Sequence, residues 1–199
     1  MIAKEKFKLI QKEGSPVTVG GVQTKMLIGR GTSQITNTVA VEATRKGYFL
    51  PDFSVGNGSI VNNEVTGESY LVAATYPEEY AGEKLSVYAA MFVCNAVVDI
   101  QSITTEYDDN GDKTTKLNPI LTNSPCYMQR VSGDLKQYDP GIHPDAEYIL
   151  FVPACGATLL DTITVKDHSP QLKFKAVDIN NFILEGITRI QVKAETRNA

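Results

Sequence analysis

DTITVKDHSPQLKFKAVDINNFILEGITRIQVKA, residues 161–194, is the stretch that decides the fold. Apolar and polar residues alternate within it in three runs, which begin at Asp161, Leu172 and Thr188. Such alternation is typical of half-buried antiparallel strands, and turn residues at 166–170 and 180–186 separate the runs. The stretch therefore predicts a three-strand meander with a charged outer face. Nothing in it has a pattern typical of catalysis.

The remainder of the chain is also strand-like. Further segments with strand composition and spacing are 17–19, 22–28, 39–41, 70–74, 85–94, 97–107, 113–117, 127–131 and 147–152. The segments 97–107 and 113–117 predict a long hairpin, with the acidic sequence 108–112 at its tip. We predict a mainly β fold with two small antiparallel β-barrel or sandwich-like modules and a short N-terminal helix.

The N-terminal segment has helical rather than strand spacing. Ile2, Phe7 and Ile10 lie near one stripe between lysines, and Gly14 is a suitable C-cap. A helix this short is marginal alone, so we expect it to dock on a domain or on a neighbouring subunit. We predict three parts: a helix over 1–14, an N-terminal β domain over 15–122 and a C-terminal β domain over 123–199.

Prolines place the predicted boundary between the two β domains. Asn118-Pro119 and Asn123-Ser-Pro125 interrupt the strand pattern there, and 133–145 predicts a long loop. A weak internal similarity crosses this boundary. Gly82 follows Tyr70, and Gly186 follows Phe174, by the same number of residues, with a strand pattern on either side of each glycine. Two related barrels would produce this similarity, and so would the chance recurrence of a common strand-turn-strand pattern.

Composition excludes some classes of function. The 199 residues are 42% apolar and 21% charged, which suits a globular core, and the net charge is −4. A negative net charge disfavours a bare nucleic-acid binder and attraction to anionic membranes. Residues 1–8 mix charges where a signal peptide needs an apolar segment, and no apolar run is long enough to cross a membrane, so we expect assembly in the cytoplasm.

Candidate chemistry is sparse. The three cysteines, Cys94, Cys126 and Cys155, form no CxxC pair, and we expect them to be reduced and mostly buried. The acidic tip 108–112 departs from a calcium loop, because Leu117 stands where the bidentate glutamate belongs. His143 and His168 lie in predicted loops without a nucleophile motif. We therefore predict no enzyme, and no catalytic, cofactor-binding or metal-binding residues.

With these segments in view, the chain resembles the head-completion and stopper proteins of tailed bacteriophages. The resemblance rests on Glu147–Pro153, Asp161–Val165, Phe174–Asp178 and Gly186–Val192, and in the front half on Val17–Val19, Gly58–Val61, Glu68–Val72 and Val93–Asn95. It implies a non-enzymatic virion protein that forms a ring in the neck, between the portal and the tail. The implied partners are further copies of the chain, portal or adaptor proteins and tail proteins, with transient DNA passage but no specific DNA binding and no membrane.

This interpretation suggests two sets of site residues. The candidate interface residues are Ile2, Phe7, Ile10, Tyr138 and Ile142, which lie in the helix and the long loop. The candidate channel-facing tip is Asp108, Asp109 and Asp112, where negative charge would keep DNA from sticking. The alternatives are a tail-tube, tail-terminator or baseplate component and, from other classes, a carbohydrate-binding or adhesion module or a hydrolase. A carbohydrate-binding module usually carries a surface tryptophan, and this chain has none.

Overall fold

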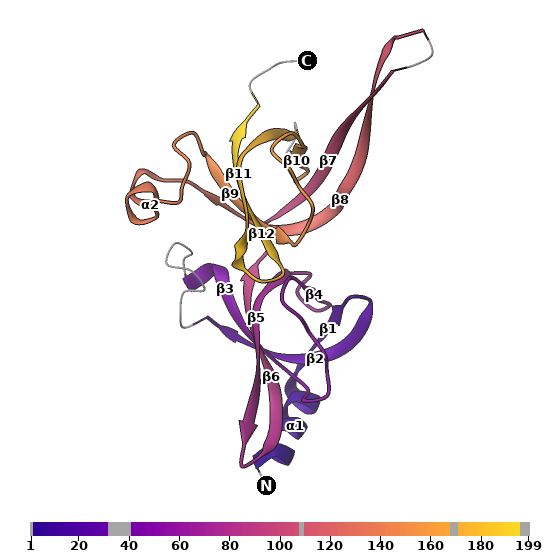
Figure 1. The fold of residues 1–199 in the computed structure, drawn as a ribbon. Coiled ribbons are helices and arrows are strands. Elements are labelled where there is room, and N and C mark those ends of the chain that lie inside the picture. Colours follow the sequence, from indigo (N-terminus) through magenta and orange to yellow (C-terminus); the bar gives the residue numbers. More distant parts are fainter. Residues whose placement is uncertain (1, 32–40, 108–109, 168–170, 196–199) are drawn as a thin grey trace. The chain divides into compact units, whose positions relative to one another are not determined.

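The computed structural model describes residues 2–31, 41–107, 110–167 and 171–195 (Figure 1). It confirms the predicted fold class, because the chain is mostly β and forms two closed antiparallel barrels of six strands each, preceded by a short helix. The helix, α1, covers Ile2–Glu13. None of the described helices is long and apolar enough to span a bilayer.

The first barrel has the strand order β1-β2-β3-β6-β5-β4. Its strands are β1 (Ser15–Val19), β2 (Val22–Arg30), β3 (Thr44–Phe49), β4 (Ile60–Asn63), β5 (Ser69–Tyr80) and β6 (Glu83–Val93). Alternate residues of these strands point inward and form one buried cluster, which includes Val17, Met26, Phe49 and Met91. This inward alternation is the pattern that closes a sheet around its own side chains.

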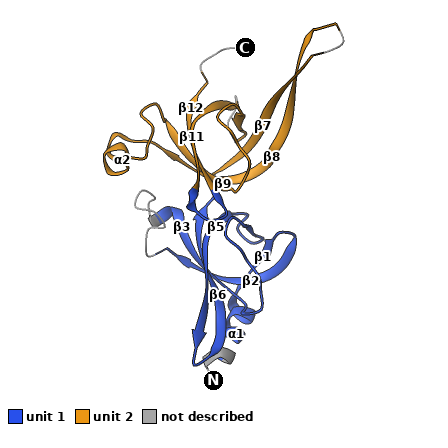
Figure 2. Cartoon of the chain, in the orientation of Figure 1, with its two compact units in different colours: residues 1–94, 182–187 blue, residues 95–181, 188–199 orange. Residues whose placement is uncertain are grey.

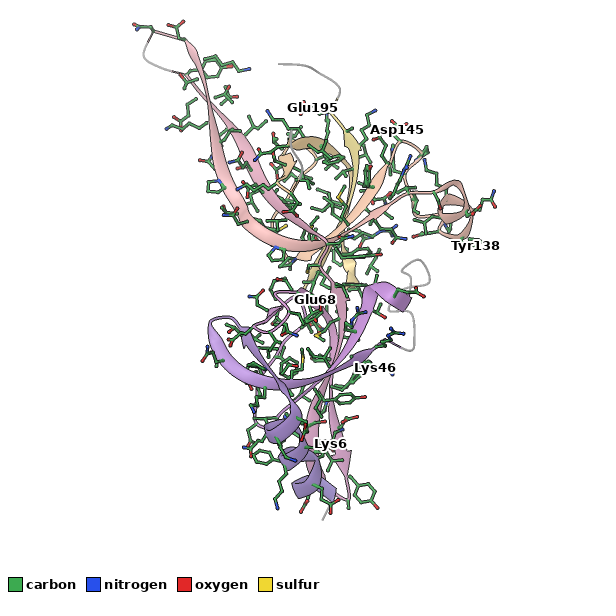
Figure 3. The ribbon with its side chains drawn as sticks, turned by 180° about the vertical axis from the view of Figure 1, so that it is seen from behind. Lys6, Lys46, Glu68, Tyr138, Asp145 and Glu195 are labelled. Atoms are coloured by element: carbon green, nitrogen blue, oxygen red, sulfur yellow. The ribbon has the colours of Figure 1, made fainter. Side chains whose placement is uncertain are left out.

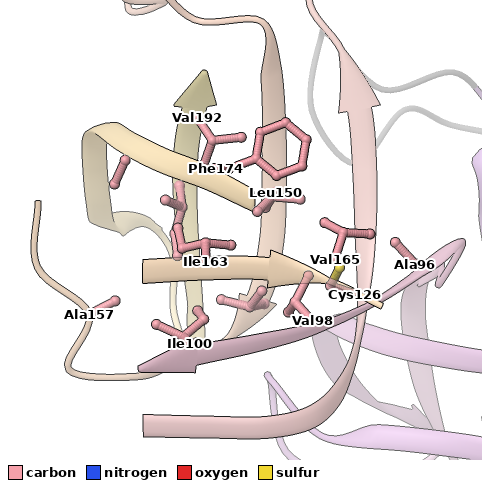
Figure 4. Close-up of a cluster of buried hydrophobic side chains, with 13 residues drawn as sticks. Ala96, Val98, Ile100, Cys126, Leu150, Ala157, Ile163, Val165, Phe174 and Val192 are labelled. Carbon is pink, nitrogen blue, oxygen red and sulfur yellow. The ribbon is translucent and has the colours of Figure 1, made fainter. Parts of the chain in front are cut away.

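The second barrel has the strand order β10-β11-β12-β9-β8-β7. Its strands are β7 (Ala96–Tyr107), β8 (Lys113–Arg130), β9 (Tyr148–Pro153), β10 (Thr162–Val165), β11 (Leu172–Leu184) and β12 (Ile187–Ala194). The predicted meander is present, because β10, β11 and β12 are consecutive neighbours. Val98, Ile100, Ile163, Phe174 and Val192 are among the side chains that fill the barrel (Figure 4).

The two barrels share one strand order. Read backwards, the order of the second barrel is β7-β8-β9-β12-β11-β10. If its strands are numbered one to six in chain order, this becomes 1-2-3-6-5-4, which is the order of the first barrel. Thus β5 and β6 correspond to β11 and β12, and the β3–β4 loop corresponds to the β9–β10 loop. The glycines that the sequence comparison paired, Gly82 and Gly186, lie in the two-residue turns of these corresponding hairpins.

The chain divides into two compact units (Figure 2). The first contains residues 1–94 and 182–187, and the second contains 95–181 and 188–199. The first unit thus includes the turn between β11 and β12. The sequence instead placed a boundary between 122 and 123, which falls inside β8.

Strand β8 runs through the prolines that were expected to interrupt it. Pro119 pairs with Gln101 and Pro125 with Val97 in the β7–β8 ladder. On the other edge of β8, the pairing with β9 covers only Tyr127–Arg130. An open edge lets a strand include proline without losing a ladder hydrogen bond, so these prolines end no strand.

Two further local predictions differ from the structure. The predicted loop 133–145 contains a short helix, α2 (Gly133–Tyr138), because the Ser132 hydroxyl accepts the Leu135 N–H as an N-cap. The predicted strand at 39–41 falls largely outside the described residues, and Val41–Ala43 form a 3₁₀ turn.

Helix α1 packs on its own barrel. Ile10 is fully buried, and the Gly14 N–H donates to the Ile10 carbonyl where the helix ends. Lys6, labelled in Figure 3, forms an ion pair with Glu78 on β5. The Lys6 ammonium also lies 4.5 Å from the centre of the Tyr48 ring on β3. These contacts attach the helix through one apolar and one charged anchor.

Candidate assembly surface

The β7–β8 hairpin continues beyond the second barrel as a two-stranded ribbon (Figure 1). The pairing of β7 with β10 ends at Gln101. Beyond it, Ile103–Tyr107 and Lys113–Leu117 pair only with each other, and all of these residues are exposed. We call these two segments the arm. At about 3.4 Å per residue, the arm is about 17 Å long.

One face of the arm satisfies its own polar groups. Glu106 and Lys116 form an ion pair of 2.7 Å. The Asn118 side-chain amide, at the base of the arm, donates to the Thr104 hydroxyl at 2.8 Å. Cross-strand pairs of this kind stabilise a ribbon modestly and keep that face suited to water.

The opposite face of the arm carries three exposed apolar side chains, together with a pair of threonines and Lys113, which lies opposite Tyr107. Ile103 lies directly opposite Leu117, and Thr105 opposite Thr115, while Tyr107 lies nearest the tip. The exposed fractions are 47% for Ile103, 53% for Leu117 and 70% for Tyr107. We call this set the apolar arm face. Adjacent exposed apolar side chains of this size are typical of a protein-interaction surface.

Among the described residues, the outer backbone edges of the arm pair with no other strand. A ribbon of two strands has an unpaired edge on each side, and an isolated hairpin is only marginally stable in water. Open edges of this kind can add a strand from another chain. The arm therefore combines an apolar face with two available edges, and both features suit docking on another protein.

A second exposed segment is held rigidly on the other side of the same barrel. Residues 132–147, which we call the strap, include α2 and cross the outer side of β12. Asp139 of the strap forms an ion pair of 2.8 Å with Arg189, and the Gly141 carbonyl accepts from Gln191 at 2.8 Å. The strap presents Tyr138, which is exposed (Figure 3). An exposed tyrosine next to these contacts suits an interface anchor.

Arg189 and Gln191 hold the strap, a role that the sequence could not identify. Strand alternation placed both on the outer, solvent-facing side of the last strand. The strap covers them, so that β12 is buried on both faces from Ile187 to Val192. Gln191 accepts the His143 N–H and donates to Asp178 as well as to Gly141. No local pattern in the sequence indicates which loop covers which strand.

The candidate interface residues from the sequence fall in different environments. Both Tyr138 and Ile142 belong to the strap, and Tyr138 is exposed whereas Ile142 is buried. Ile10 is buried against the first barrel and Phe7 is half-buried. Ile2 begins α1, and its side chain lies outside the described residues. The structure thus leaves Tyr138 as the member of this set that a partner could reach most easily.

The acidic tip is described only in part. Asp108 and Asp109 lie outside the described residues, and Asp112 is exposed just before β8 begins. Gly111 has a φ of 85°, which suits the tight turn that the sequence predicted at this point. The tip follows the arm directly in the sequence.

The cysteines and histidines are the candidate reactive side chains, and the structure describes the surroundings of most of them. Burial raises the pKa of the Cys94 thiol to about 12. Burial also raises the pKa of Cys155, and both thiols are protonated near neutral pH. His143 accepts the Asp145 N–H, while His168 lies outside the described residues. Among the described residues, no three His, Cys, Asp or Glu side chains are grouped so as to hold a metal ion.

The first barrel carries a row of tyrosines on its outer side. Tyr48, Tyr88 and Tyr76 are direct cross-strand neighbours on β3, β6 and β5. Their ring centres lie 5.5 Å apart for Tyr48 and Tyr88 and 6.1 Å apart for Tyr88 and Tyr76. Tyr76 is exposed and also borders a shallow pocket of about 220 Å³. The rings of Tyr48 and Tyr88 are tilted by 58°, and those of Tyr76 and Tyr88 are stacked, so the row is an aromatic surface with Tyr76 at its exposed end.

Comparison with known proteins adds no relative: no protein-family model matches the chain, and no curated protein matches it.

Proposed function

We propose that the chain is a non-enzymatic structural protein of a tailed-bacteriophage virion, which forms a ring in the head–tail connector and is assembled in the host cytoplasm. The strand segments that resemble stopper proteins support this proposal. Portal or adaptor proteins on one side and tail proteins on the other are the proposed neighbours. A tail-tube, tail-terminator or baseplate position is the alternative within the same particle.

The observation that carries the proposal is the arm. An enzyme that acts alone has no need of an exposed ribbon with an apolar face. A subunit of a closed ring must present different surfaces to its neighbours, because head-to-tail contacts close by rotation. Ile103, Leu117 and Tyr107 provide one such surface at the end of a rigid barrel.

Substitutions on the two faces of the arm test the proposal. Ile103→Asp places a charge on the apolar arm face, and Thr104→Asp places the same charge on the polar face at the next residue. We expect Ile103→Asp to abolish incorporation into connectors assembled with portal and tail proteins, as seen by electron microscopy. Thr104→Asp should retain incorporation. Both variants should fold, because neither side chain is buried.

If Ile103→Asp enters connectors as well as the unaltered chain, the arm makes no assembly contact and the proposal loses its main support. If the unaltered chain enters no connector, tail tube or baseplate, the virion assignment fails.

A carbohydrate-binding or adhesion function is the second candidate, and the row of tyrosines favours it. Sugar rings stack on flat aromatic surfaces, and Tyr76 offers one beside a shallow pocket that Lys84 also lines. We expect any glycan binding to be lost in Tyr76→Ala and kept in Tyr138→Ala, measured on a glycan array. Absence of binding by the unaltered chain would remove this candidate.

A further inference from the structure

The shared strand order makes one loop and one turn in each unit equivalent. The β3–β4 loop of the first barrel corresponds to the β9–β10 loop of the second. The two-residue turn Ala81-Gly82, between β5 and β6, corresponds to Glu185-Gly186, between β11 and β12. Equivalent parts of a repeated fold can make equivalent contacts. The contact that the β3–β4 loop makes therefore indicates what kind of segment the β9–β10 loop can bind.

In the first unit, the loop is occupied by a turn. Residues 182–187 belong to that unit, and Gly186 packs against the β3–β4 loop at Asn57 and Gly58. A Cβ at Gly58 would lie 2.0 Å from the Gly186 carbonyl oxygen. A Cβ at Gly186 would lie 2.4 Å from the Asn57 carbonyl oxygen. The two backbones thus meet directly, which only glycine at these positions permits.

In the second unit, the equivalent loop is uncovered and apolar. A turn from Thr158 to Asp161 closes it, with the Thr158 N–H donating to the Asp161 carboxylate at 2.6 Å. Leu159 and Leu160 occupy the centre of this turn and are 50% and 79% exposed. Turn centres usually carry Gly, Pro, Asn, Asp or Ser. Two exposed leucines there favour an apolar partner.

In the described part of the chain, nothing packs on the equivalent turn of the first barrel at Gly82. Gly82 has the φ of 81° that matches the 76° of Gly186. A Cβ at Gly82 would meet no atom within 4 Å, in contrast to Gly186. Tyr80, at the end of β5, is 59% exposed beside this turn. The chain therefore has one uncovered turn with an aromatic side chain and one uncovered loop with two leucines.

We propose that the β5–β6 turn of one copy docks on the β9–β10 loop of a second copy, with Tyr80 packed on Leu159 and Leu160. The occupant is a second copy because the uncovered turn and the uncovered loop are the counterparts of the turn and loop that meet in the first unit. Side chains of Tyr80, Leu159 and Leu160 would make this contact, in place of the glycine backbones. The contact is head-to-tail, so each chain gives a turn and receives one. This deepens the proposed function, on which it rests, by naming the surfaces that join neighbours in the ring.

Complementation between two variants tests the pairing. Tyr80→Asp places a charge beside the β5–β6 turn and leaves the β9–β10 loop unchanged. Leu160→Asp places a charge in the β9–β10 loop and leaves the β5–β6 turn unchanged. Val65→Asp, at another exposed apolar residue in a turn of the first barrel, is the control. Circular dichroism checks that each variant folds, and Leu160→Ser replaces Leu160→Asp if the latter does not. Light scattering after size exclusion gives the masses across concentration.

We expect the unaltered chain and Val65→Asp to grow in mass with concentration, and each of the other variants to self-associate at least tenfold more weakly. A mixture of Tyr80→Asp and Leu160→Asp should form one-to-one dimers and no larger species. The unaltered β5–β6 turn of Leu160→Asp can bind the unaltered β9–β10 loop of Tyr80→Asp, and no second functional pair of surfaces remains. A strictly monomeric unaltered chain overturns the pairing. So does unchanged association in either variant, or a mixture that forms no dimer.

The connector experiment separates this pairing from the proposed function. Complementation without entry of the unaltered chain into any virion structure would keep the pairing and remove the virion role. Entry into connectors, with unchanged self-association in Tyr80→Asp, would keep the role and remove the pairing.

Discussion

Arg189 shows how a single residue can be placed on the correct face and still be misjudged. Strand alternation correctly puts it on the outside of the barrel, but the strap covers that outside and leaves Arg189 only 7% exposed. Its guanidinium is paired with Asp139, while its Nε has no hydrogen-bond partner among the described residues. A buried charge of this kind depends strongly on its one partner.

Asp139→Ala should therefore destabilise the protein much more than Asp145→Ala. Both aspartates lie in the strap and both pair with β12, but the Lys193–Asp145 pair is exposed and 3.5 Å long. We expect a loss of about 3–5 kcal/mol in the free energy of unfolding for Asp139→Ala, because a buried cation loses its partner. Asp145→Ala should lose about 0.5 kcal/mol. Urea unfolding measures both losses. Equal losses would show that the Asp139–Arg189 pair stabilises the fold no more than the exposed Lys193–Asp145 pair.

Among the elements, α1 illustrates what an amphipathic pattern leaves undecided. The sequence predicts the helix and its apolar stripe, but an apolar stripe is compatible with its own domain or with a neighbour. Residues distant in the chain decide that the helix packs on its own barrel, because Lys6 pairs with Glu78 of β5 and lies over the ring of Tyr48 of β3. Glu78 also accepts the Ser86 hydroxyl, so it has two donors.

The attachment of α1 should weaken in acid. Burial raises the pKa of Glu78, but the hydrogen bonds from Lys6 and Ser86 outweigh it and leave the pKa below its ordinary value. A carboxylate with a lowered folded pKa stabilises the fold above its unfolded pKa and loses that contribution as the pH falls through the folded pKa. Glu78→Gln should therefore cost about 1 kcal/mol or less at pH 7, where solvent screens the pair, and almost nothing near pH 3.

Urea unfolding of Glu78→Gln and of the unaltered chain at both pH values measures this difference. Glu79→Gln, at the exposed neighbouring residue, is the control and should show little difference at either pH. A Glu78→Gln effect that persists at pH 3 would mean that shape rather than charge attaches the helix.

Strand prediction succeeded where side-chain alternation decides the structure and was wrong where pairing partners decide it. Alternation identified the meander, the strands β5 and β6 in part, and the long β7–β8 hairpin. Prolines 119 and 125 were expected to end a strand, but β8 has an open edge there, and the sequence does not specify which edges are open. The apolar arm face was hidden for the same reason, because Ile103 and Leu117 resemble ordinary core residues until the ribbon leaves the barrel.

At the scale of the whole molecule, two barrels with one strand order account for the weak similarity in the sequence. The paired glycines Gly82 and Gly186 lie in corresponding turns, so the similarity follows the fold. The sequence alone could not choose between repetition and chance, because short strand patterns recur freely. It could not predict the packing of Gly186 on Asn57 either, since the two residues are far apart in the chain.

The two glycines therefore form a matched pair for a stability test. Both have positive φ, so alanine at either position should cost about 1 kcal/mol from backbone strain alone. Gly186→Ala should cost about 2 kcal/mol more, because its Cβ would collide with the Asn57 carbonyl, whereas the space around Gly82 is open. Denaturant unfolding of both variants checks this. Equal losses would show that the turn at Gly186 is not packed.

The division of the chain between its two units also has a consequence during protein synthesis. The ribosome releases β1–β6 well before residues 182–187 of the same unit, because β7 to β10 and most of β11 lie between them. Until then, the first barrel waits with its β3–β4 loop uncovered, while the second barrel is still being made. The last contact of the first unit can therefore form only after β7 to β11 of the second barrel have been translated.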